Sequence, residues 1–485
     1  MGKKILGLFL YFGVIPLGLS LIPFAIAYDK LMITSLVPLI LGGVLIGFFA
    51  SKRLQKQDRL KELAIVFLLP LAYTAVLWAV FMLITGGFSG AMAWLIYCIF
   101  HIAMAPIFFL ASLMGEGRLF LWAPLAYELS FVFGILLAIL IKKDWKAFGF
   151  NRKQLLSVLT VFVLAMATGA TVQWQRSKTV LPSYGFDYGG GYSSTDLYPY
   201  EVLNPENKLP KLSEPATFTI KDLSEMPVLD GAEAAFPVYS AFANATYENI
   251  EGVMGEVKEV VTFTNTIYAY ERLLSGEVDI YFGAEPSKEQ LEMAERAGKE
   301  LVMTPIGKEA FVFFVNPDNK VDSLTVSEIR EIYSGTITNW SALEGKNEKI
   351  IAFQRPKNSG SQTLLEKIMG DTPIMKPLKE EVPEGMGGII EQVADYRNYD
   401  NSIGFSFRFF ATGMNANPDI KLLAINGVEP SPENIASGTY PFTASLYAIS
   451  LKDNPKSTID PFLAWMKGQQ GQEIIEKIGY IKIGE

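Results

Sequence analysis

The sequence is most informative at Gln354-Arg355-Pro356-Lys357-Asn358-Ser359-Gly360-Ser361-Gln362-Thr363. An arginine stands here four residues before a Ser-Gly-Ser turn, and the turn opens a helical pattern over Thr363–Met369. A guanidinium offers a planar fork of hydrogen-bond donors that suits a tetrahedral oxyanion. A helix N-terminus adds backbone N–H groups and a favourable dipole for the same anion. We therefore interpret this stretch as half of an oxyanion-binding cleft.

Charge divides the 485 residues into a basic front and an acidic back. Residues 1–178 contain 16 Lys and Arg against 6 Asp and Glu, a net charge of +10. The remainder contains 26 basic and 44 acidic residues, a net charge of −18. A strongly acidic domain lacks the basic footprint that a phosphate backbone requires, so nucleic acid is excluded as a partner.

The basic front consists mainly of apolar runs, each close to the roughly 20 residues that span a hydrocarbon core. These runs predict an all-α transmembrane bundle of five or six membrane segments over residues 1–178. A removable signal peptide is the weaker interpretation, because a second run follows the first at once with no small-residue cleavage site. The runs are Ile5–Ala27, Leu31–Ala50, Leu63–Ile84, Ala91–Met114, Leu119–Ile141 and Leu155–Val172.

Basic residues indicate the orientation of these segments. They cluster before the first run, after the second and before the last, and the positive-inside rule places all three clusters in the cytoplasm. Three runs lie between the two later clusters, although two cytoplasmic loops demand an even number of crossings. Ala91–Met114 is the run that we expect to be re-entrant or interfacial, because it contains His101 and Pro106. The last run then exits, which predicts a multi-pass protein of the cell membrane with an extracytoplasmic C-terminal domain.

Two ionisable residues, His101 and Glu128, lie within the apolar runs. An ionisable residue inside a membrane segment is by default a candidate functional residue, and a role in transport is one interpretation of these two. A hydrogen bond at a helix end or between helices is the other, and we favour it. The only cysteine, Cys98, also lies in an apolar run, so the C-terminal domain has no disulfide and no thiol chemistry.

Residues 179–214, rich in Gly, Pro, Tyr and Ser, predict an extracytoplasmic linker. Short apolar runs and amphipathic stretches then alternate, which predicts an α/β domain over 215–485. Capping boxes are expected at Thr325 with Glu328 and at Ser359 with Gln362. Expected strands are Pro227–Leu229, Glu259–Thr262, Asp279–Phe282, Ala310–Val315, Ile350–Gln354, Ile403–Ser406, Lys421–Ile425 and Leu446–Ser450. Expected helices are Ala234–Tyr247, Thr266–Ser275, Lys288–Ala297, Val326–Tyr333, Thr363–Met369, Ile389–Tyr396 and Ile459–Lys467.

Five segments of this domain resemble, in family order, the type II periplasmic solute-binding proteins, specifically the phosphate-binding receptor of ABC uptake systems. The resemblance implies a two-lobed type II periplasmic-binding-protein fold, with lobe one at about 215–308 and 443–485, and lobe two at about 310–440. It implies a ligand between the lobes, and it says nothing about the membrane segments. The segments are Asp230–Pro237, Val278–Glu285, Ile332–Trp340, Arg355–Ser361 and Ser402–Phe405.

In lobe two, the family likeness assigns Arg355 to the bound oxyanion, with donors from Ser359, Gly360 and Ser361. The alternatives are a surface salt bridge for Arg355 and a plain helix cap for Ser359. We favour the binding role for both, because the guanidinium and the helix N-terminus complement the same anion.

In lobe one, the family's anion turn usually supplies Ser or Thr, whereas this sequence supplies Ala232, Glu233 and Ala234. Glu233 either completes a capping box with Asp230 or accepts the proton of a hydrogen phosphate, and both interpretations stay open. The family uses an acid in that way to prefer phosphate over sulfate.

Glu285 lies near the place where the family's acid falls, and it is a second candidate for the proton acceptor. Thr264 and Thr266 are further candidate ligands, with simple N-capping as the alternative.

The membrane segments and the family resemblance together imply a membrane-anchored binding protein for phosphate or a similar oxyanion, acting in uptake or sensing. The C-terminal domain has no His and no Cys, so an enzyme is not expected, although a carboxylate-pair hydrolase is not excluded by composition. No catalytic residue, cofactor or metal is predicted. Expected partners are the lipid bilayer and separate ABC permease and ATPase subunits, because the sequence contains no Walker segment. The alternative is a degenerate binding fold that serves signalling or surface interaction without binding an anion.

Overall fold

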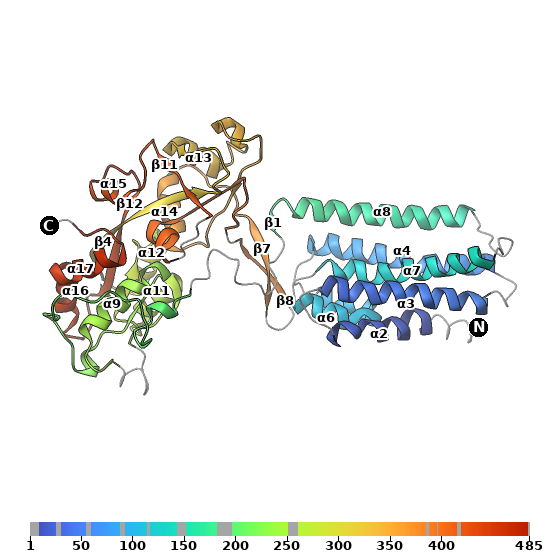
Figure 1. The fold of residues 1–485 in the computed structure, drawn as a ribbon, viewed down its shortest axis with the longest axis horizontal. Helices are drawn as coiled ribbons and strands as arrows, with labels where there is room; N and C mark the ends of the chain where they lie inside the picture. Colours follow the sequence, from blue (N-terminus) through green and yellow to red (C-terminus); the bar gives the residue numbers. More distant parts are fainter. Residues whose placement is uncertain are drawn as a thin grey trace. The chain divides into compact units, whose positions relative to one another are not determined.

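The computed structural model describes residues 9–25, 31–54, 60–87, 93–113, 117–142, 152–181, 196–250, 260–384, 388–394, 396–414 and 419–483. Contacts divide the chain into two units. The first contains residues 1–190 and 379–392, and the second contains residues 191–378 and 393–485. Figure 1 shows the helices of the first unit in blue to green and the α/β elements of the second in green to red.

The first unit is built around long apolar helices whose axes run alongside one another (Figure 1). The described part of each expected apolar run is largely helical. The helices are α2 (Ile15–Ser20), α3 (Leu31–Leu54), α4 (Leu60–Thr85), α5 (Ala93–Phe100), α6 (Ala105–Leu113), α7 (Leu119–Lys142) and α8 (Arg152–Arg176). Three stretches of the described residues are long and apolar enough to cross a membrane: Leu31–Ser51, Leu119–Ala138 and Leu156–Arg176.

The fourth apolar run is broken at His101. It forms α5, a short 3-10 turn over Ile102–Met104, and α6. His101 itself has the non-helical backbone angles φ −120° and ψ 43°. At 1.5 Å per residue, α5 and α6 each extend only about 12–14 Å, less than half of a hydrocarbon core.

Small residues bring α3 and α7 together. Gly43 and Gly47 lie one turn apart on α3, and Gly134 faces them from α7. A methyl group at Gly47 would overlap the carbonyl oxygen of Phe131, and one at Gly134 would overlap that of Val44. The two backbones therefore touch, which is the packing that small residues at this spacing permit in apolar surroundings.

A small sheet completes the first unit. It has the order β1-β7-β8, formed by β1 (Val180–Leu181), β7 (Lys379–Glu384) and β8 (Gly388–Val393). β1 pairs in parallel with β7, with Val180 opposite Lys379. The expected helix over Ile389–Tyr396 is wrong, because most of it is strand β8. Ile389, Ile390 and Val393 are β-branched, and such residues favour a strand once a partner strand is available.

The second unit contains one central sheet with the strand order β2-β3-β12-β4-β9-β6, and β10 pairs with β4. β2 and β3 are parallel, β12 is antiparallel to β3 and β4, and β9 is antiparallel to β4 but parallel to β6. The strands are β2 (Leu229–Gly231), β3 (Ile280–Gly283), β4 (Leu301–Val315), β6 (Ile351–Ala352), β9 (Ser402–Phe407), β10 (Lys421–Leu422) and β12 (Thr443–Leu451). A separate pair is formed by β5 (Ser323–Leu324) and β11 (Ala424–Ile425).

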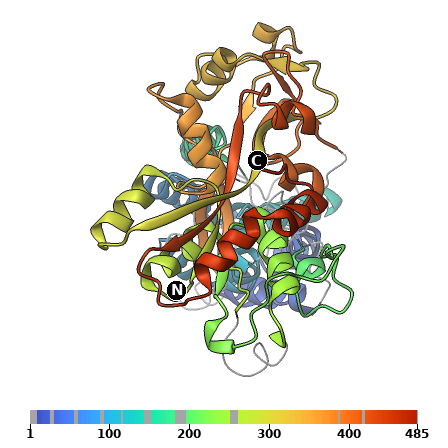
Figure 2. The same ribbon diagram turned by 90° about the vertical axis from the view of Figure 1, so that its left-hand side faces the viewer.

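Two long strands connect two lobes of this unit. Residues 301–310 of β4 pair with β12, whereas residues 311–315 pair with β9. We define the first lobe by β2, β3 and the helices α9 (Phe236–Thr246), α11 (Asn265–Ser275), α12 (Lys288–Arg296), α16 (Ile459–Lys467) and α17 (Gln469–Ile478). The second lobe has β6, β9, β10 and the helices α13 (Val326–Ser334), α14 (Gly360–Met369) and α15 (Pro432–Ala436). Figure 2 shows the green first-lobe and orange second-lobe elements at opposite ends of β4 and β12.

Aromatic side chains fill the core of each lobe. In the first, the Tyr239 ring stacks on that of Phe282 with the centroids 5.1 Å apart. In the second, Phe311 and Phe405 pack with their centroids 5.3 Å apart. Leu197 and Tyr200, from the expected linker, pack against the first-lobe core.

Most of the expected elements of this unit are present, and the differences are local. The strand expected over Glu259–Thr262 is only an isolated bridge between Leu229 and Val261, and Glu259 lies outside the described residues. The capping box of Thr325 and Glu328 is confirmed. Of the capping box expected for Ser359 and Gln362, only one hydrogen bond forms: the Ser359 side chain accepts from the N–H of Gln362, and the return bond from the Gln362 side chain is absent.

Candidate functional site

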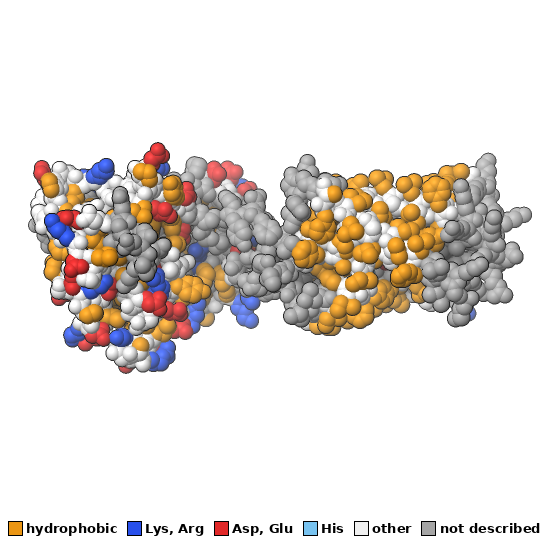
Figure 3. All heavy atoms as spheres, turned by 90° about the horizontal axis from the view of Figure 1, so that it is seen from below, with side chains coloured by type: hydrophobic (Ala, Val, Ile, Leu, Met, Phe, Trp, Pro, Cys, Tyr) orange, Lys and Arg blue, Asp and Glu red, His pale blue; other side chains and the backbone are white. Residues whose placement is uncertain are grey.

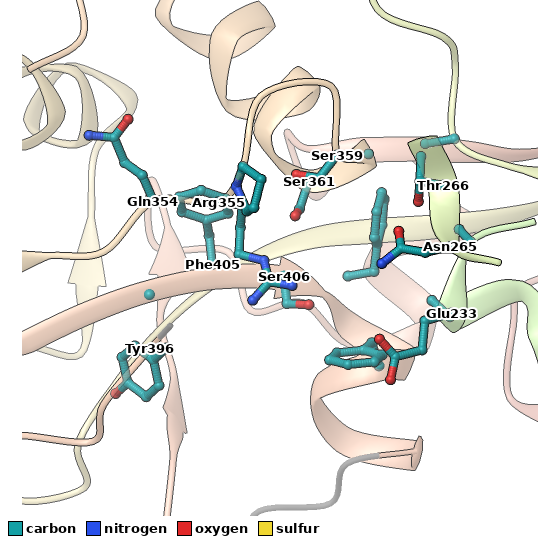
Figure 4. A pocket seen from close by; sticks show the side chains of 18 of the residues that line it. Glu233, Asn265, Thr266, Gln354, Arg355, Ser359, Ser361, Tyr396, Phe405 and Ser406 are labelled. Carbon is teal, nitrogen blue, oxygen red and sulfur yellow. The ribbon is translucent and has the colours of Figure 1, made fainter. Parts of the chain in front are cut away.

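A cavity of about 140 Å³ lies between the two lobes of the second unit. Its walls come from the N-terminal ends of α11 and α14, the 3-10 turn before α9 and the strand β9 (Figure 4). The lining residues are Ala232, Glu233, Ala234, Asn265, Thr266, Ile267, Ala284, Phe353, Gln354, Arg355, Pro356, Ser359, Gly360, Ser361, Tyr396, Gly404, Phe405, Ser406, Phe407 and Phe410.

The loop that carries Arg355 is fixed at its backbone. The backbone N–H of Arg355 donates to Oε1 of Gln362 at 3.0 Å. Nε2 of Gln354 donates to the carbonyl of Met375 at 2.9 Å. Because Gln362 turns toward Arg355, it does not reach back to Ser359, and the expected reciprocal capping box does not form. The Arg355 guanidinium lies in the cavity, beside Ser406 (Figure 4).

The N-terminus of α14 forms the wall next to Arg355. Ser359 is its N-cap, with Oγ accepting from the N–H of Gln362 at 3.4 Å. Ser361 follows in the first turn, and its hydroxyl points toward the centre of the cavity (Figure 4). The first N–H groups of a helix have no partner within the helix. The sequence segment thus brings a guanidinium, a helix N-terminus and a hydroxyl together in one place.

The first lobe supplies Glu233 on the opposite side (Figure 4). Glu233 begins a 3-10 turn, Glu233–Ala235, whose N-cap Ala232 has no side-chain cap. The N–H of Ala232 donates to the carbonyl of Phe282 at 2.7 Å, which fixes this turn on β3. Ala232 and Ala234 line the cavity without offering a side-chain donor.

Asn265 and Thr266 complete the first-lobe wall at the start of α11. Asn265 has φ 76°, in the left-handed region that asparagine tolerates better than most residues. Strained backbone of this kind often accompanies ligand sites. The amide of Asn265 points into the cavity in Figure 4.

Asp230 is buried and accepts hydrogen bonds from several groups. It does not cap the turn that contains Glu233. Its Oδ1 accepts from the N–H groups of Gly231 at 2.8 Å and Thr264 at 2.9 Å. Its Oδ2 accepts from the hydroxyls of Thr262 at 2.9 Å and Thr264 at 2.8 Å, and it pairs with Arg272. Of the two interpretations of Glu233, the capping box with Asp230 is therefore wrong, because the Asp230 carboxylate is occupied elsewhere.

Thr264 and Glu285 do not line the cavity, although the sequence suggested both as ligands. The hydroxyl and N–H of Thr264 are directed to Asp230. The carboxylate of Glu285 forms an ion pair with Nζ of Lys367 at 2.7 Å. Of the two candidate proton acceptors, the structure thus brings only Glu233 to the cavity.

Polar contacts join the two lobes beside the cavity. Nζ of Lys357 lies 2.6 Å from Oε2 of Glu289. Nδ2 of Asn358 donates to the same oxygen at 3.1 Å, and the hydroxyl of Ser287 donates to Oδ1 of Asn358 at 2.9 Å. The hydrogen bonds from Lys357 and then Asn358 lower the pKa of Glu289. These contacts link the N-terminal end of α12 in the first lobe to the loop before α14 in the second.

Sequence reasoning missed several residues of the cavity, above all Asn265, Gln354 and Ser406. Asn265 stands between the two threonines that were singled out, so the segment was found but not the residue. Ser406 directly follows the matched segment Ser402–Phe405, and only alternation along β9 could have drawn attention to it. Tyr396 also lines the cavity, and burial raises its pKa to about 12, so its hydroxyl stays protonated.

The arrangement suits binding of a small polar solute better than chemistry upon it. Donors come from Arg355, from the start of α14 and from Asn265, while Glu233 is an acidic acceptor. Within the described ranges, no group of three or more His, Cys, Asp or Glu side chains could hold a metal ion.

Comparison with known proteins identifies the second unit. Residues 228–469 match the PBP superfamily domain. The C-terminal part of the chain is a PBP superfamily domain. The expected relationship to type II solute-binding proteins is thereby confirmed for this part.

Several curated relatives of the PBP superfamily domain are binding proteins by name. The phosphate-binding protein PstS of Bacillus subtilis is 27% identical over 38% of this chain and 59% of its own length. The matched region thus spans about three fifths of that relative. The protein SphX of Synechococcus elongatus is 23% identical over 55% of this chain and 81% of its own length. Because such relatives are binding proteins and not enzymes, the expectation that this domain is not an enzyme is confirmed.

Solved structures similar to the PBP superfamily domain include proteins named as receptors of phosphate transporters. One is a putative phosphate ABC transporter substrate-binding protein with bound phosphate from Clostridium perfringens, with a TM-score of 0.40 and 21% identity over 53% of this chain and 98% of that one. Another is an ABC-type phosphate transport receptor from Vibrio cholerae, with a TM-score of 0.38 and 20% identity over 53% of this chain and 99% of that one.

Proposed function

We propose that this chain is a membrane-anchored, extracytoplasmic solute-binding protein for phosphate or a similar oxyanion, acting in uptake or sensing. The observation that carries the proposal is the cavity between the lobes, where the guanidinium of Arg355 lies beside the N-terminus of α14. Both groups complement a small anion. The names of the curated relatives support phosphate as the first anion to test.

In this proposal, Arg355 forms charge-assisted hydrogen bonds to two oxygens of the anion. Ser359, Gly360 and Ser361 add N–H and hydroxyl donors, and Thr266 donates from the first lobe. Glu233 accepts the proton of a hydrogen phosphate, because an ionised carboxylate next to a dianion is stabilised only when a proton lies between them.

The first unit anchors the protein in the lipid bilayer. Large apolar side chains cover its described surface (Figure 3, right), including Ile33, Leu45 and Phe49 of α3. We propose five crossings and one re-entrant run, because the break at His101 leaves two helices too short to cross. This assignment keeps every basic cluster in the cytoplasm and removes the odd number of crossings between them.

The proposed organisation is a transmembrane domain over residues 1–178, a linker over 179–214 and a binding domain over 215–485. Separate ABC permease and ATPase subunits would receive the ligand if the protein acts in uptake. The sequence itself supplies no nucleotide-binding segment.

A binding fold that no longer binds an anion is the second candidate function. Ala232 and Ala234 favour it, because they present no hydroxyl where a donor would contact the anion. Glu233 favours it further, since its charge opposes an unprotonated anion.

Titration calorimetry on the full chain in nanodiscs tests the proposal, with phosphate, sulfate, molybdate and a neutral sugar as ligands. We expect heat with phosphate, and we expect Arg355→Ala to weaken binding by about tenfold to a hundredfold, since hydrogen bonds to a charged group contribute about 1.5–3 kcal/mol.

Arg296→Ala is the matched control, because Arg296 lies on the exposed surface of α12. It should leave the binding heat unchanged. If the wild-type protein gives no heat with any oxyanion, the second candidate function is favoured. If Arg355→Ala binds phosphate like the wild type, the proposed site is wrong.

A further inference from the structure

The first unit contains a second cavity, of about 540 Å³, which lies among its helices. We call it the lateral cavity. Aromatic, aliphatic and proline side chains make up most of its wall. Its lining residues are Phe9, Phe12, Gly13, Pro16, Leu69, Pro70, Tyr73, Phe100, His101, Ile102, Ala103, Met104, Pro124, Tyr127 and Glu128.

Three buried polar side chains from separate helical segments contact one another, and two of them, His101 and Glu128, line this cavity. Thr74 of α4 is fully buried, while His101 and Glu128 are 8% and 7% exposed. The hydroxyl of Thr74 donates to Oε1 of Glu128 at 2.9 Å. It also lies 3.0 Å from Nε2 of His101.

This geometry determines which ring nitrogen of His101 carries a hydrogen toward Thr74. The Thr74 hydroxyl has a single hydrogen, which it gives to Glu128, so it must accept from Nε2–H of His101. The other polar atoms, Nδ1 of His101 and Oε2 of Glu128, are buried and have no hydrogen-bond partner among the described residues. Buried polar atoms without a partner are costly, so a pair of them beside one cavity indicates a missing ligand.

The imidazole is held rigidly in place. The ring of Tyr97 stacks on it with the centroids 4.7 Å apart, and the ring of Tyr73 packs at 5.4 Å. The hydroxyl of Tyr97 donates to the carbonyl of Phe120 at 2.8 Å. Pro124, four residues later, cannot donate to that carbonyl, so Tyr97 satisfies an acceptor that the proline leaves open. A side chain fixed in this way is preorganised for a ligand.

The rim of the lateral cavity is apolar and exposed. Phe9 is 64% exposed, Phe100 54% and Ile102 65%. These side chains form part of the hydrophobic outer surface of the helices. In the membrane location proposed above, such a rim faces acyl chains, and a ligand would enter from the lipid.

We propose that the lateral cavity binds a lipid-phase alcohol, an apolar molecule with one free hydroxyl. This inference rests on the proposed membrane location of the first unit. The apolar wall takes the hydrocarbon part, and the hydroxyl satisfies the two unpaired atoms of His101 and Glu128.

A hydroxyl fits because it donates and accepts at once. With neutral His101 and protonated Glu128, Nδ1 is an acceptor and the acid O–H is a donor. With the proton moved from Glu128 to His101, Nδ1–H is the donor and Oε2 is the acceptor. Each arrangement leaves one donor and one acceptor, so a hydroxyl satisfies both, whereas an ether lacks the hydrogen and an alkane lacks both groups.

Photolabelling of the full chain in nanodiscs tests this site, with a diazirine-bearing hexadecanol as the probe and its methyl ether as the matched control probe. We expect the alcohol to label peptides of the lateral cavity and unlabelled hexadecanol to compete. The ether should label about two- to tenfold less, the factor expected for one hydrogen bond. Equal labelling by both probes, or no labelling of these peptides, would overturn the proposal.

Variants separate the polar groups from the apolar wall. His101→Phe and Glu128→Leu should each lower labelling by about two- to tenfold. Glu128→Gln keeps a donor and an acceptor and should be labelled more strongly than Glu128→Leu. Leu140→Ala, on the exposed surface of α7 and outside the lateral cavity, is the control variant and should be labelled like the wild type. Thermal unfolding of each variant checks its folding, and the comparison of alcohol with ether in the wild type remains decisive if a variant does not fold.

The nanodisc step also distinguishes the two proposals. Protein that does not enter the bilayer would contradict both the membrane location and the lipid ligand. Protein that enters the bilayer but is labelled equally by both probes contradicts only the lipid ligand.

Discussion

In the proposed function, Glu233 is the residue through which the cavity between the lobes distinguishes one anion from another. Its carboxylate points into the cavity, opposite Arg355 (Figure 4). A proton-carrying ligand can donate to it, whereas sulfate has no proton at neutral pH and meets only repulsion. Glu233→Gln removes that repulsion. We therefore expect the variant to gain sulfate binding by about tenfold and to lose part of its phosphate affinity, as measured by titration calorimetry.

Glu285→Gln is the matched control, because the Glu285 carboxylate pairs with Lys367 and does not line the cavity. It should leave the preference for phosphate over sulfate unchanged. A Glu233→Gln protein with the wild-type preference would show that Glu233 does not accept the proton.

At the scale of residues, the second-lobe half of the candidate site could be predicted and the first-lobe half only in part. Arg355 and the Ser-Gly-Ser turn are contiguous, so local geometry alone brings them together. Thr264 was misjudged because its partner, Asp230, is 34 positions away in the chain. No local pattern shows that a buried carboxylate has already taken the hydroxyl.

At the scale of elements, the strand β4 carries a titratable group where it passes from one lobe to the other. Glu309 is 5% exposed, and it accepts from the N–H groups of Ala310 at 2.8 Å and Phe409 at 3.1 Å. Burial raises its pKa from 4.5 to about 7. Between these two values the folded chain binds more protons than the unfolded chain, so this group destabilises the fold as the pH rises, by about 3 kcal/mol in all.

Glu309→Gln should remove this pH dependence. Glutamine mimics the neutral acid, so the difference in unfolding free energy between variant and wild type should be constant below about pH 4.5. The difference should grow in favour of the variant up to about pH 7 and then level off. Denaturant unfolding of the second unit across this range measures it. A difference that does not change with pH would contradict the assigned role.

The elements that sequence reasoning misjudged are those whose form depends on distant partners. A helix was expected over Ile389–Tyr396, yet β8 extends there because β7 lies alongside it. β7 in turn pairs with β1, nearly 200 positions earlier in the chain. The helices with full caps were easier to predict, because Thr325 and Glu328 determine the start of α13 locally.

At the scale of the whole molecule, the proposed topology places residue 118 and the second unit on the same side of the membrane. Single cysteines at Arg118 and Lys221, both exposed, in a Cys98→Ser background should react with an impermeant maleimide on intact cells. A cysteine at Lys56 should react only after the membrane is opened. If Arg118→Cys is protected while Lys221→Cys reacts, the fourth run crosses the bilayer and the five-crossing assignment is wrong.

The division into a basic apolar front and an acidic back was visible in the sequence, because composition needs no knowledge of contacts. The assignment of residues 379–392 to the unit that contains the front was not visible. That assignment depends on a pairing between strands far apart in the chain, which composition does not record.

The position of His101 has a practical consequence for spectroscopy. It is the sole histidine of the sequence, and its ring lies in the wall of the lateral cavity. Protein isotopically labelled on histidine alone would therefore give one imidazole signal that needs no assignment by mutagenesis. That signal would report directly on the occupancy of a cavity far removed in sequence from the residues that line the cavity between the lobes.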